Sequence, residues 1–386
     1  VWLVPPVTAA SWAKAESSYA GMPDWHGAFT IEGRGPAVAE RFRFAEQAAT
    51  LELIAETEGE SFYRGELAEK IVAHAQNTGG LLTAEDLANH QPEWVTPLAI
   101  DYRGQSLHEI PPNGQGITAL IALGILRQFD LKGHIVDSAD SLHLQIEAMK
   151  LAYADARRYV SDPKTRDIDF EQLLDDDYLR QRASHIDTAR AQAHDAGTPG
   201  QGETVYLTAA DADGRMVSFI QSNFAGFGSG IVVPGTGIAL NNFMNWFDNV
   251  KGSPNAIGPS RKNEMCLSPA QVWDKNGLRL LIGTPGSYGI LQTTPQMIMN
   301  VLDHGMNVQA AIEAPRVKAT RNHNVDTETR IPADVRAELE RRGHSLSDLG
   351  DWSAGVGGGQ GIHIDPDSGS FMGGGDPRRD GYALGC

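Results

Sequence analysis

A threonine, Thr204, stands where a small, polar stretch of chain meets a strand-like run. A threonine hydroxyl is a weak nucleophile and needs a base beside it. If the chain cut itself between Glu203 and Thr204, the new α-amine of Thr204 would be that base, since such amines titrate near pH ~8. The junction therefore supplies the arrangement that a self-exposed nucleophile needs, although spacing alone favours an ordinary strand residue. A purely structural role for Thr204, as the first residue of a strand, also fits the position, because β-branched residues commonly open strands.

Other kinds of catalytic or binding site find less support in the sequence. His134 and His143 lie near one another, but neither HExxH nor paired CxxC spacing occurs. The run Asp211–Gly214 lacks the later ligands of a calcium loop and predicts a hairpin turn instead. The glycine runs 355–361 and 373–375 lack the strand–helix context of dinucleotide binding, and no GxSxG elbow or Walker loop is present. We expect no metal and no cofactor.

Charge and composition limit the kinds of partner that this chain is expected to bind. Acidic residues outnumber basic ones 49 to 32, a balance that argues against nucleic acid or an anionic membrane surface. The only cysteines, Cys266 and Cys386, allow at most one disulfide, so the redox compartment stays open. The chain opens at Val1 without methionine or a basic leader, and we expect a preceding segment to be absent from it. Its compartment, cytoplasmic or periplasmic, is therefore not predicted.

Hydrophobic periodicity predicts helices first and strands later, in an α+β body. Helices are expected over 35–59, 65–80, 117–129, 141–160, 175–186, 290–305 and 333–343, with a capping box at 83–86. Strands are expected over 98–110 with a turn at 103–104, over 204–211 and 215–222 around Gly214, and over 231–240, 277–283, 359–365 and 369–375. Residues 188–203 lack periodicity and predict an exposed linker.

Several motifs together resemble one family across nearly the whole chain. The run 202–242, GETVYLTAADADGRMVSFIQSNFAGFGSGIVVPGTGIALNN, resembles the segment around the catalytic threonine of the gamma-glutamyltranspeptidase family. Upstream, FYRGELAEKIV, PPNGQG and LAYADARRYVSDP are similar to that family's large-subunit region. Downstream, SPAQV, LIGTPGSYGI, APRV and GGGDPRRDGYALG are similar to its small subunit.

The resemblance implies a four-layer αββα sandwich of the N-terminal-nucleophile hydrolase type. It implies a zymogen cut into a large-subunit part, Val1–Glu203, and a small subunit, Thr204–Cys386, which stay together and can pair as a homodimer of heterodimers. By motif position Thr204 is the nucleophile and Ser222 the hydroxyl that bonds to it. Gly286 and Ser287 take the places of two oxyanion-hole glycines, where backbone N–H groups do the work.

The substrate-binding positions depart from the family pattern. They are Phe224, Asn242, Phe243, Trp246, Met265 and Cys266. Phe224 replaces an asparagine, Phe243 a glutamine or glutamate, Trp246 an aspartate, and Met265 and Cys266 a pair of serines. A substrate ammonium group would meet aromatic rings here, although Phe243 and Trp246 also suit plain core packing. We expect weak or absent glutathione turnover and a different acyl group, as in the family's acylase-like branch.

The sequence thus predicts a gamma-glutamyltransferase-like amidohydrolase or acyltransferase acting on a small-molecule amide through an acyl-enzyme on Thr204. A genuine gamma-glutamyl transferase of glutathione metabolism remains an alternative. A second is an uncleaved, non-catalytic relative with a binding or structural role, and a third is a hydrolase that uses other residues. The acyl group, and whether water or an amine resolves the intermediate, are left open.

Overall fold

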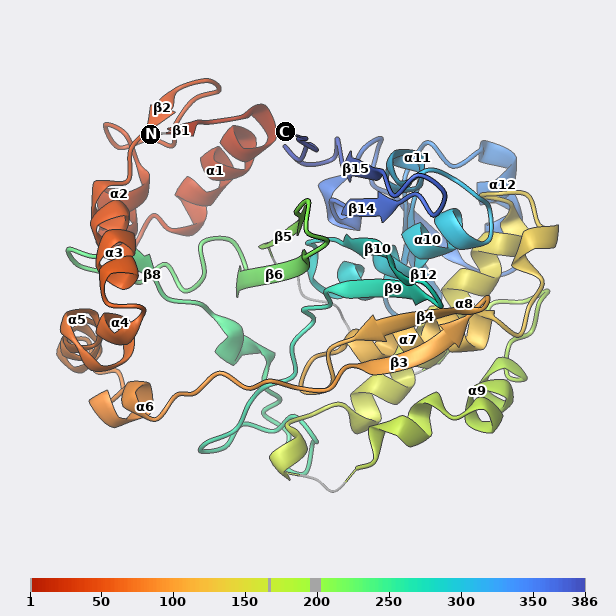
Figure 1. Cartoon of the computed structure of the whole chain (residues 1–386), viewed down its shortest axis with the longest axis horizontal. Helices are drawn as coiled ribbons and strands as arrows, with labels where there is room; N and C mark the ends of the chain where they lie inside the picture. The colour runs from red at the N-terminus through yellow and green to blue at the C-terminus, as the bar shows by residue number, and fades with distance from the viewer. Residues whose placement is uncertain (1, 166–167, 195–202, 386) are drawn as a thin grey trace. The chain divides into compact units, whose positions relative to one another are not determined.

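The computed structural model describes residues 2–165, 168–194 and 203–385 (Figure 1). Two compact units divide the chain. Unit 1 comprises Val1–Trp94 and Asn223–Asn242, and unit 2 comprises Val95–Ser222 and Phe243–Cys386. Most of the expected linker, residues 195–202, lies outside the described residues, as does Cys386. The predicted division at 203/204 marks a peptide bond within unit 2, and it stays a prediction.

Unit 1 is mainly helical, with two short pairs of antiparallel strands, β1–β2 and β7–β8. Its elements are β1 (Trp2–Leu3), α1 (Pro6–Ser18), α2 (Pro23–Phe29), β2 (Arg41–Phe42), α3 (Ala45–Glu56), α4 (Glu60–Arg64), α5 (Glu66–Asn77), α6 (Ala84–Ala88), β7 (Val232–Val233) and β8 (Ile238–Ala239). Trp12, Trp25, Phe29 and Phe227 pack edge to face or tilted at its centre. Tyr19 ties the two chain segments together, because its hydroxyl accepts from Phe227 N at 3.0 Å and donates to Gly228 O at 3.1 Å.

The predicted helix over 35–59 is wrong in its first part. Residues up to Phe44 are not helical, because Arg41–Phe42 pairs with Trp2–Leu3 as β2, and the helix begins only at Ala45. The helix expected over 65–80 is confirmed as α5. The capping box is confirmed as well, with Thr83 and Asp86 bonding reciprocally at the start of α6.

Unit 2 is built on an antiparallel sheet of six strands in the order β15-β14-β10-β9-β4-β3. The strands are β3 (Leu98–Tyr102), β4 (Gln105–Glu109), β9 (Ala270–Asp274), β10 (Gly277–Gly283), β14 (Gln360–Ile364) and β15 (Phe371–Gly375). The turn expected at 103–104 is confirmed, with positive φ at both Arg103 and Gly104. The sheet joins a segment from before position 204 to segments from after it, since β4 pairs with β9.

Helices pack on one face of this sheet. Those in contact with its strands are α7 (Gly116–Leu126), α10 (Ile290–Leu302) and α11 (Val308–Glu313). Helices α8 (Ala139–Tyr159) and α9 (Asp176–Ala183) pack on α7, and α12 (Ala333–Arg341) packs on α8. Short 3-10 turns are η1 (Leu131–Gly133), η2 (Pro163–Thr165), η3 (Phe170–Leu174), η4 (Phe243–Trp246), η5 (Ser287–Gly289) and η6 (Ala354–Val356). Every residue of α7 is buried, as an all-apolar helix requires. No helix within the described residues combines the length and hydropathy needed to cross a bilayer.

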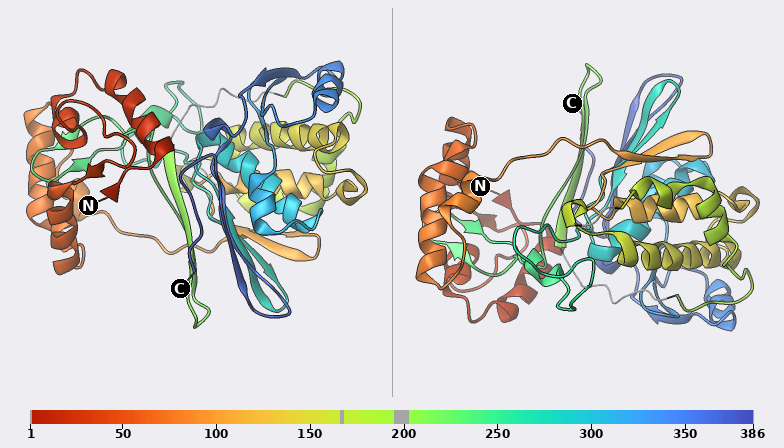
Figure 2. Two further views of the ribbon diagram at one scale, coloured as in Figure 1. Left: turned by 90° about the horizontal axis from the view of Figure 1, so that it is seen from above. Right: turned by 90° about the horizontal axis from the view of Figure 1, so that it is seen from below.

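A hairpin, β5 (Glu203–Ala210) and β6 (Met216–Phe224), lies along the other face of the sheet (Figure 2). Its residues alternate between an inner and an outer face. Thr204 and Tyr206 are buried, whereas Val205, Leu207, Val217 and Phe219 are 41–54% exposed. Both strands and the turn at Gly214 follow the prediction. Unit 2 thus carries helices, a large sheet and a second, smaller sheet in that order.

A smaller sheet, not anticipated from the sequence, lies beside α8 and α12. It has the order β11-β12-β13, formed by Val317–Ala319, Asn324–Thr327 and Ser345–Asp348. Its strands are only three or four residues long, too short for an alternation pattern to be recognised. The hydrophobic cluster beneath it includes Leu142, Ile146 and Leu339.

Candidate active site

The predicted nucleophile lies at the beginning of β5. Thr204 is buried to 9% exposure, and its Oγ1 donates a hydrogen bond to Ser222 Oγ at 3.0 Å. Ser222 stands near the end of β6, on the same inner face of the hairpin. The strand pairing therefore brings together two hydroxyls separated by 18 positions in the sequence. The resemblance assigned these two residues to each other, and their side chains are in contact.

Tyr206 connects this hairpin to the main sheet. Its hydroxyl shares a 2.7 Å hydrogen bond with Ser218 Oγ, and its ring lies over the backbone of Gly283. A Cβ at Gly283 would come within 2.6 Å of that ring, so only glycine permits this approach. Since Gly283 ends β10, the contact fixes β5 against the strand that leads into the Gly286–Ser287 turn.

The turn itself has an unusual backbone. Gly286 has φ 133° and Ser287 has φ 56°, and the chain then enters η5 and α10. The first N–H groups of a helix lack intrahelical partners, and the helix dipole favours negative charge there. The two predicted oxyanion positions lie at the start of η5, just before α10, and their role stays a prediction.

A second loop supports that turn. Thr284 Oγ1 accepts from Gly358 N at 2.8 Å. A Cβ at Gly286 would lie 3.1 Å from the Cα of Gly357, so the two loops touch through their backbones. The contact between Thr284 and the run 355–361 could not be predicted, because the two are more than 70 positions apart in the chain.

Three aromatic side chains pack together after this turn, and we call Phe243, Trp246 and Tyr288 the aromatic wall. The Trp246 ring lies 4.8 Å from that of Tyr288, the residue after Ser287, and 6.3 Å from that of Phe243. Trp246 Nε1 donates to Glu264 Oε1 at 2.8 Å, and the Tyr288 hydroxyl donates to the same oxygen at 3.1 Å. Burial raises the pKa of Glu264, and these donors oppose that rise only partly. Phe243 and Trp246 are thus buried around a carboxyl group, Glu264, that sequence reasoning missed.

The loop 111–116 supports the residues after Glu264. Met265 N donates to Asn113 O at 3.0 Å, and Gln115 N donates to Met265 O at 2.7 Å. Cys266 is fully buried, and that burial raises the pKa of its thiol to about 12. A neutral thiol and a thioether therefore stand where paired serines were noted in the family pattern.

Two predicted substrate-binding residues belong to unit 1. Phe224 is buried with φ 77° at the end of β6. The Asn242 side chain holds the neighbouring loop, since Oδ1 accepts from Ala225 N at 3.0 Å and Nδ2 donates to Gly228 O at 2.9 Å. Within its unit, Asn242 thus has a structural role, and substrate contact by either residue remains a prediction.

Another carboxyl group, missed by sequence reasoning, is buried in unit 2. Glu109 ends β4 and accepts from Ser268 Oγ at 2.6 Å, while its Oε2 has no hydrogen-bond partner among the described residues. Burial raises its pKa to about 8. The signal in the sequence was faint: an acidic residue at an inward position of a strand, next to the PPNGQG loop.

Comparison with known proteins agrees with this geometry. A family model described as Gamma-glutamyltranspeptidase matches residues 2–386. The glutathione hydrolase-like YwrD proenzyme of Bacillus subtilis is 36% identical over 92% of this chain and 68% of its own length. The glutathione hydrolase proenzyme of Escherichia coli is 33% identical over 86% of this chain and 60% of its own length. The chain thus spans about two thirds of these relatives.

Among solved structures, a cephalosporin acylase from Bacillus halodurans superposes with a TM-score of 0.93 at 42% identity. The alignment covers 99% of this chain and 71% of that one. The predicted α+β fold of the N-terminal-nucleophile hydrolase type is confirmed by this match. The expected acylase-like resemblance is confirmed too, and the chain belongs to the gamma-glutamyltranspeptidase family.

Proposed function

We propose that this chain is part of an amidohydrolase or acyltransferase that cuts itself between Glu203 and Thr204 and then uses Thr204 as its N-terminal nucleophile. The observation that carries the proposal is the 3.0 Å hydrogen bond from Thr204 Oγ1 to Ser222 Oγ at the start of β5. This contact fixes the direction of the hydroxyl. A strand that begins at the cut also keeps the new amine beside that hydroxyl.

Self-cleavage begins with attack of the Thr204 hydroxyl on the carbonyl carbon of Glu203. The peptide C–N bond breaks as an ester C–O bond forms, and the amine of Thr204 takes up the proton. Water then hydrolyses the ester, which restores the hydroxyl and leaves a carboxylate on Glu203. The freed α-amine now acts as the base of the mature enzyme.

The same chemistry acts on substrate. Thr204 Oγ1 attacks the substrate amide while its α-amine accepts the proton and passes it to the leaving amine. The Gly286 and Ser287 amides, at the entrance to α10, stabilise the tetrahedral oxyanion. Water or an acceptor amine then takes the acyl group from Thr204. Both chain segments contribute, so the working form is a large and a small subunit made from one precursor.

The aromatic wall favours an acyl group without an α-ammonium. Trp246 and Phe243 offer ring faces, and both donors on Glu264 already occupy its Oε1. Because its pKa is raised by burial, Glu264 is a weaker partner for an ammonium than an exposed carboxylate would be. Cation–π contact lacks the directional hydrogen bonds that select an α-amino acid. One similar solved structure is named a cephalosporin acylase, and that name gives an acyl donor other than glutathione.

Intact-mass spectrometry of purified protein tests the nucleophile. We expect two masses that meet at 203/204 for the native sequence, and a single uncut mass for Thr204→Ala. Thr204→Ser should retain partial cleavage and activity, since serine supplies the same hydroxyl. An uncut native chain would support the non-catalytic alternative, and full activity in Thr204→Ala would place the chemistry on other residues.

A matched set of anilides tests the acyl group. Gamma-glutamyl anilide carries an α-amine and a carboxylate, glutaryl anilide lacks only the amine, and butyryl anilide lacks both. We expect kcat/KM at least tenfold higher for one of the two amine-free substrates than for gamma-glutamyl anilide. The opposite order would identify a genuine gamma-glutamyl enzyme while leaving the role of Thr204 intact.

A further inference from the structure

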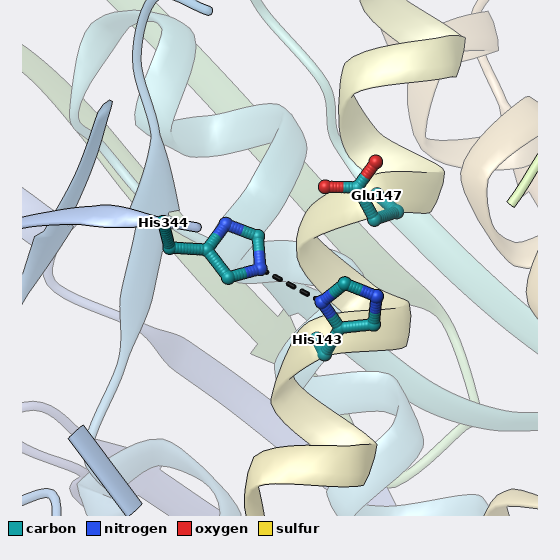
Figure 3. Close-up of side chains that lie close together, drawn as sticks. All are labelled: His143, Glu147 and His344. Atoms are coloured by element: carbon teal, nitrogen blue, oxygen red, sulfur yellow. Dashed lines mark hydrogen bonds between the residues drawn. The ribbon is translucent and has the colours of Figure 1, made fainter. Parts of the chain in front are cut away.

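Two histidines and a glutamate meet inside unit 2, outside the candidate active site. His143 and Glu147 are one turn apart on α8, and His344 comes from the connection between α12 and β13 (Figure 3). One ligand atom from each residue lies within 4.8 Å of the other two, and all three side chains are at most 3% exposed. This group could not be predicted from the sequence, because His344 is 201 positions from His143.

The hydrogen bonds define where the protons sit. His143 Nε2 lies 2.8 Å from Asp187 O, which can only accept, so Nε2 carries the proton. In the neutral ring Nδ1 then has a lone pair, which accepts from His344 Nε2 at 2.8 Å. His344 Nδ1 is buried and has no hydrogen-bond partner among the described residues. The proton between the two rings therefore links α8 to this histidine.

We propose that His143, Glu147 and His344 form a structural site for a divalent transition-metal ion, and that Zn²⁺ is the ion whose chemistry they fit. Imidazole nitrogen and carboxylate oxygen are ordinary zinc ligands. The ion takes the place of the shared proton, which moves to His344 Nδ1 as the neutral ring changes tautomer and its Nε2 becomes a ligand. The bond from His143 Nε2–H to Asp187 O is the backbone contact that typically orients a metal-bound histidine.

The two imidazole rings must move slightly apart before both can bind one zinc ion. Two nitrogens bound to tetrahedral zinc at about 2.0–2.1 Å lie about 3.3 Å apart. The present separation is 2.8 Å, so the rings must part slightly. His194 adds a fourth candidate donor, with Nε2 3.5 Å from Glu147 Oε2. Because the three core donors are buried, the site suits a structural ion rather than a catalytic one that must admit substrate.

One positively charged side chain, that of Lys150, competes with the proposed metal ion for Glu147. Lys150 Nζ lies 2.6 Å from Glu147 Oε1 and also donates to Gln192 O at 3.2 Å. Its ammonium competes with a cation for the same carboxylate. The second oxygen, Oε2, accepts only a 3.3 Å bond from Gln192 N besides the His194 contact. Metal affinity is therefore expected to rise when the ammonium is removed.

Cobalt and zinc titrations of the chelator-treated full-length protein test the site. We expect one equivalent of Co²⁺ to give the visible absorption of a tetrahedral complex, and Zn²⁺ to displace it and raise the melting temperature. His344→Asn should weaken metal binding at least tenfold, whereas His185→Asn, at an exposed histidine after α9, should not change it. Equal binding by the native protein and His344→Asn, or no tetrahedral spectrum in the native protein, overturns the proposal.

Lys150→Met provides an independent test if His344→Asn does not fold. Loss of the competing ammonium should tighten Zn²⁺ binding at least tenfold and enlarge the zinc-dependent rise in melting temperature. Unchanged zinc affinity in Lys150→Met would contradict the assignment of Glu147 as a ligand. Neither result depends on whether Thr204 is a nucleophile, so this inference and the proposed function can fail separately.

Discussion

At the scale of single residues, two serine hydroxyls on the inner face of the β5–β6 hairpin, those of Ser218 and Ser222, have different hydrogen-bond partners. Ser222 accepts the hydrogen bond of Thr204 Oγ1, while Ser218, four residues earlier on the same strand, pairs with Tyr206. Both serines are half-buried and share one face of β6. They therefore form a natural pair for separating a contribution to chemistry from a contribution to packing.

Ser222→Ala should lower kcat for the amide substrate by about tenfold to a hundredfold, since one hydrogen bond that orients a reacting group is worth roughly 1–3 kcal/mol. Ser218→Ala is the control, because it removes a neighbouring hydroxyl that does not touch Thr204. Steady-state kinetics and the extent of self-cleavage measure both variants. Equal losses in the two would show that Ser222 acts only through the stability of the hairpin.

We predict that Glu109 makes the free energy of unfolding depend on pH. Burial raises its pKa to about 8, whereas a glutamate in the unfolded chain titrates near pH ~4.3. Between these values the unfolded chain has lost a proton that the folded chain keeps. The free energy of unfolding from this group therefore falls with rising pH, by about 1.4 kcal/mol per unit at most, and levels off above pH 8.

Glu109→Gln should remove that dependence while keeping the shape of the side chain and its contact with Ser268. We expect stability close to the native protein's near pH 5 and greater than it at pH 8, as measured by urea denaturation across the range. Glu340→Gln, at an exposed position of α12, is the control. A native-like decline in Glu109→Gln would show that another group causes the loss.

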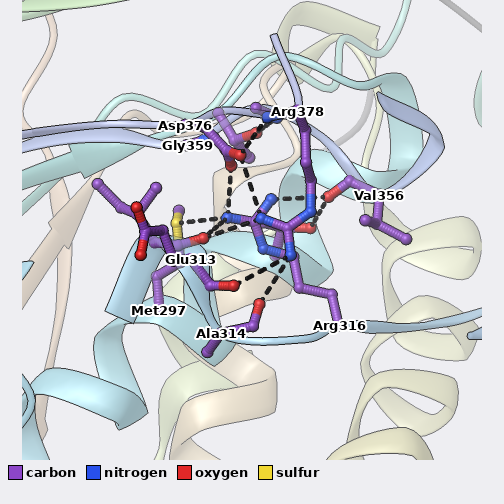
Figure 4. A network of polar contacts seen from close by, with 12 residues as sticks. Met297, Glu313, Ala314, Arg316, Val356, Gly359, Asp376 and Arg378 are labelled. Atoms are coloured by element: carbon purple, nitrogen blue, oxygen red, sulfur yellow. Dashed lines mark hydrogen bonds and ion pairs between the residues drawn. The ribbon is translucent and has the colours of Figure 1, made fainter. Parts of the chain in front are cut away.

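At the scale of elements, buried arginines hold the segment after β15 against the loops of the active site (Figure 4). Arg378 Nη2 lies 2.6 Å from Glu328 Oε2, and Arg316 Nη2 lies 2.7 Å from Asp376 Oδ2. Asp376 Oδ2 also accepts from Gly359 N at 2.7 Å. Since Gly357 touches Gly286, this network supports the turn that we propose as the oxyanion site.

Arg378→Met should lower the free energy of unfolding by about 3–5 kcal/mol, because it leaves the Glu328 and Asp376 carboxylates buried without their shared partner. The matched variant is Arg341→Met, which removes an exposed pair with Glu338 and should cost about 0.5 kcal/mol or less. Chemical denaturation measures both. A cost for Arg378→Met no greater than for Arg341→Met would exclude a structural role for the network.

The sequence predicts elements well where one periodicity dominates. The all-apolar run of α7 and the alternating β5–β6 hairpin follow their expected spans closely. The prediction fails where tertiary pairing decides, as at Arg41–Phe42, which becomes a strand only because Trp2–Leu3 lies beside it. Glu264 and the His143–His344 pair were missed for the same reason, since their meaning depends on partners far away in the chain.

At the scale of the whole molecule, the proposed cut does not separate two independent bodies. Strands β3 and β4 come from before position 204, and β9, β10, β14 and β15 come from after it, yet all six form one sheet. Leu107 of β4 pairs with Val272 of β9 in the interior of that sheet. Helices α7 and α10, one from each side of the cut, share the same hydrophobic core.

The two fragments should therefore stay together after cleavage. Separating them would break the β4–β9 ladder and expose the core between α7 and α10, a loss comparable to unfolding unit 2. We expect processed protein to elute from a sizing column in native buffer as one species containing both fragments, and to resolve into two bands only after denaturation. Uncut Thr204→Ala should elute at the same volume, because the cut removes one peptide bond and no pairing. Release of either fragment in native buffer would mean that the shared sheet does not hold the halves together, and that the mature catalyst cannot draw its site from both.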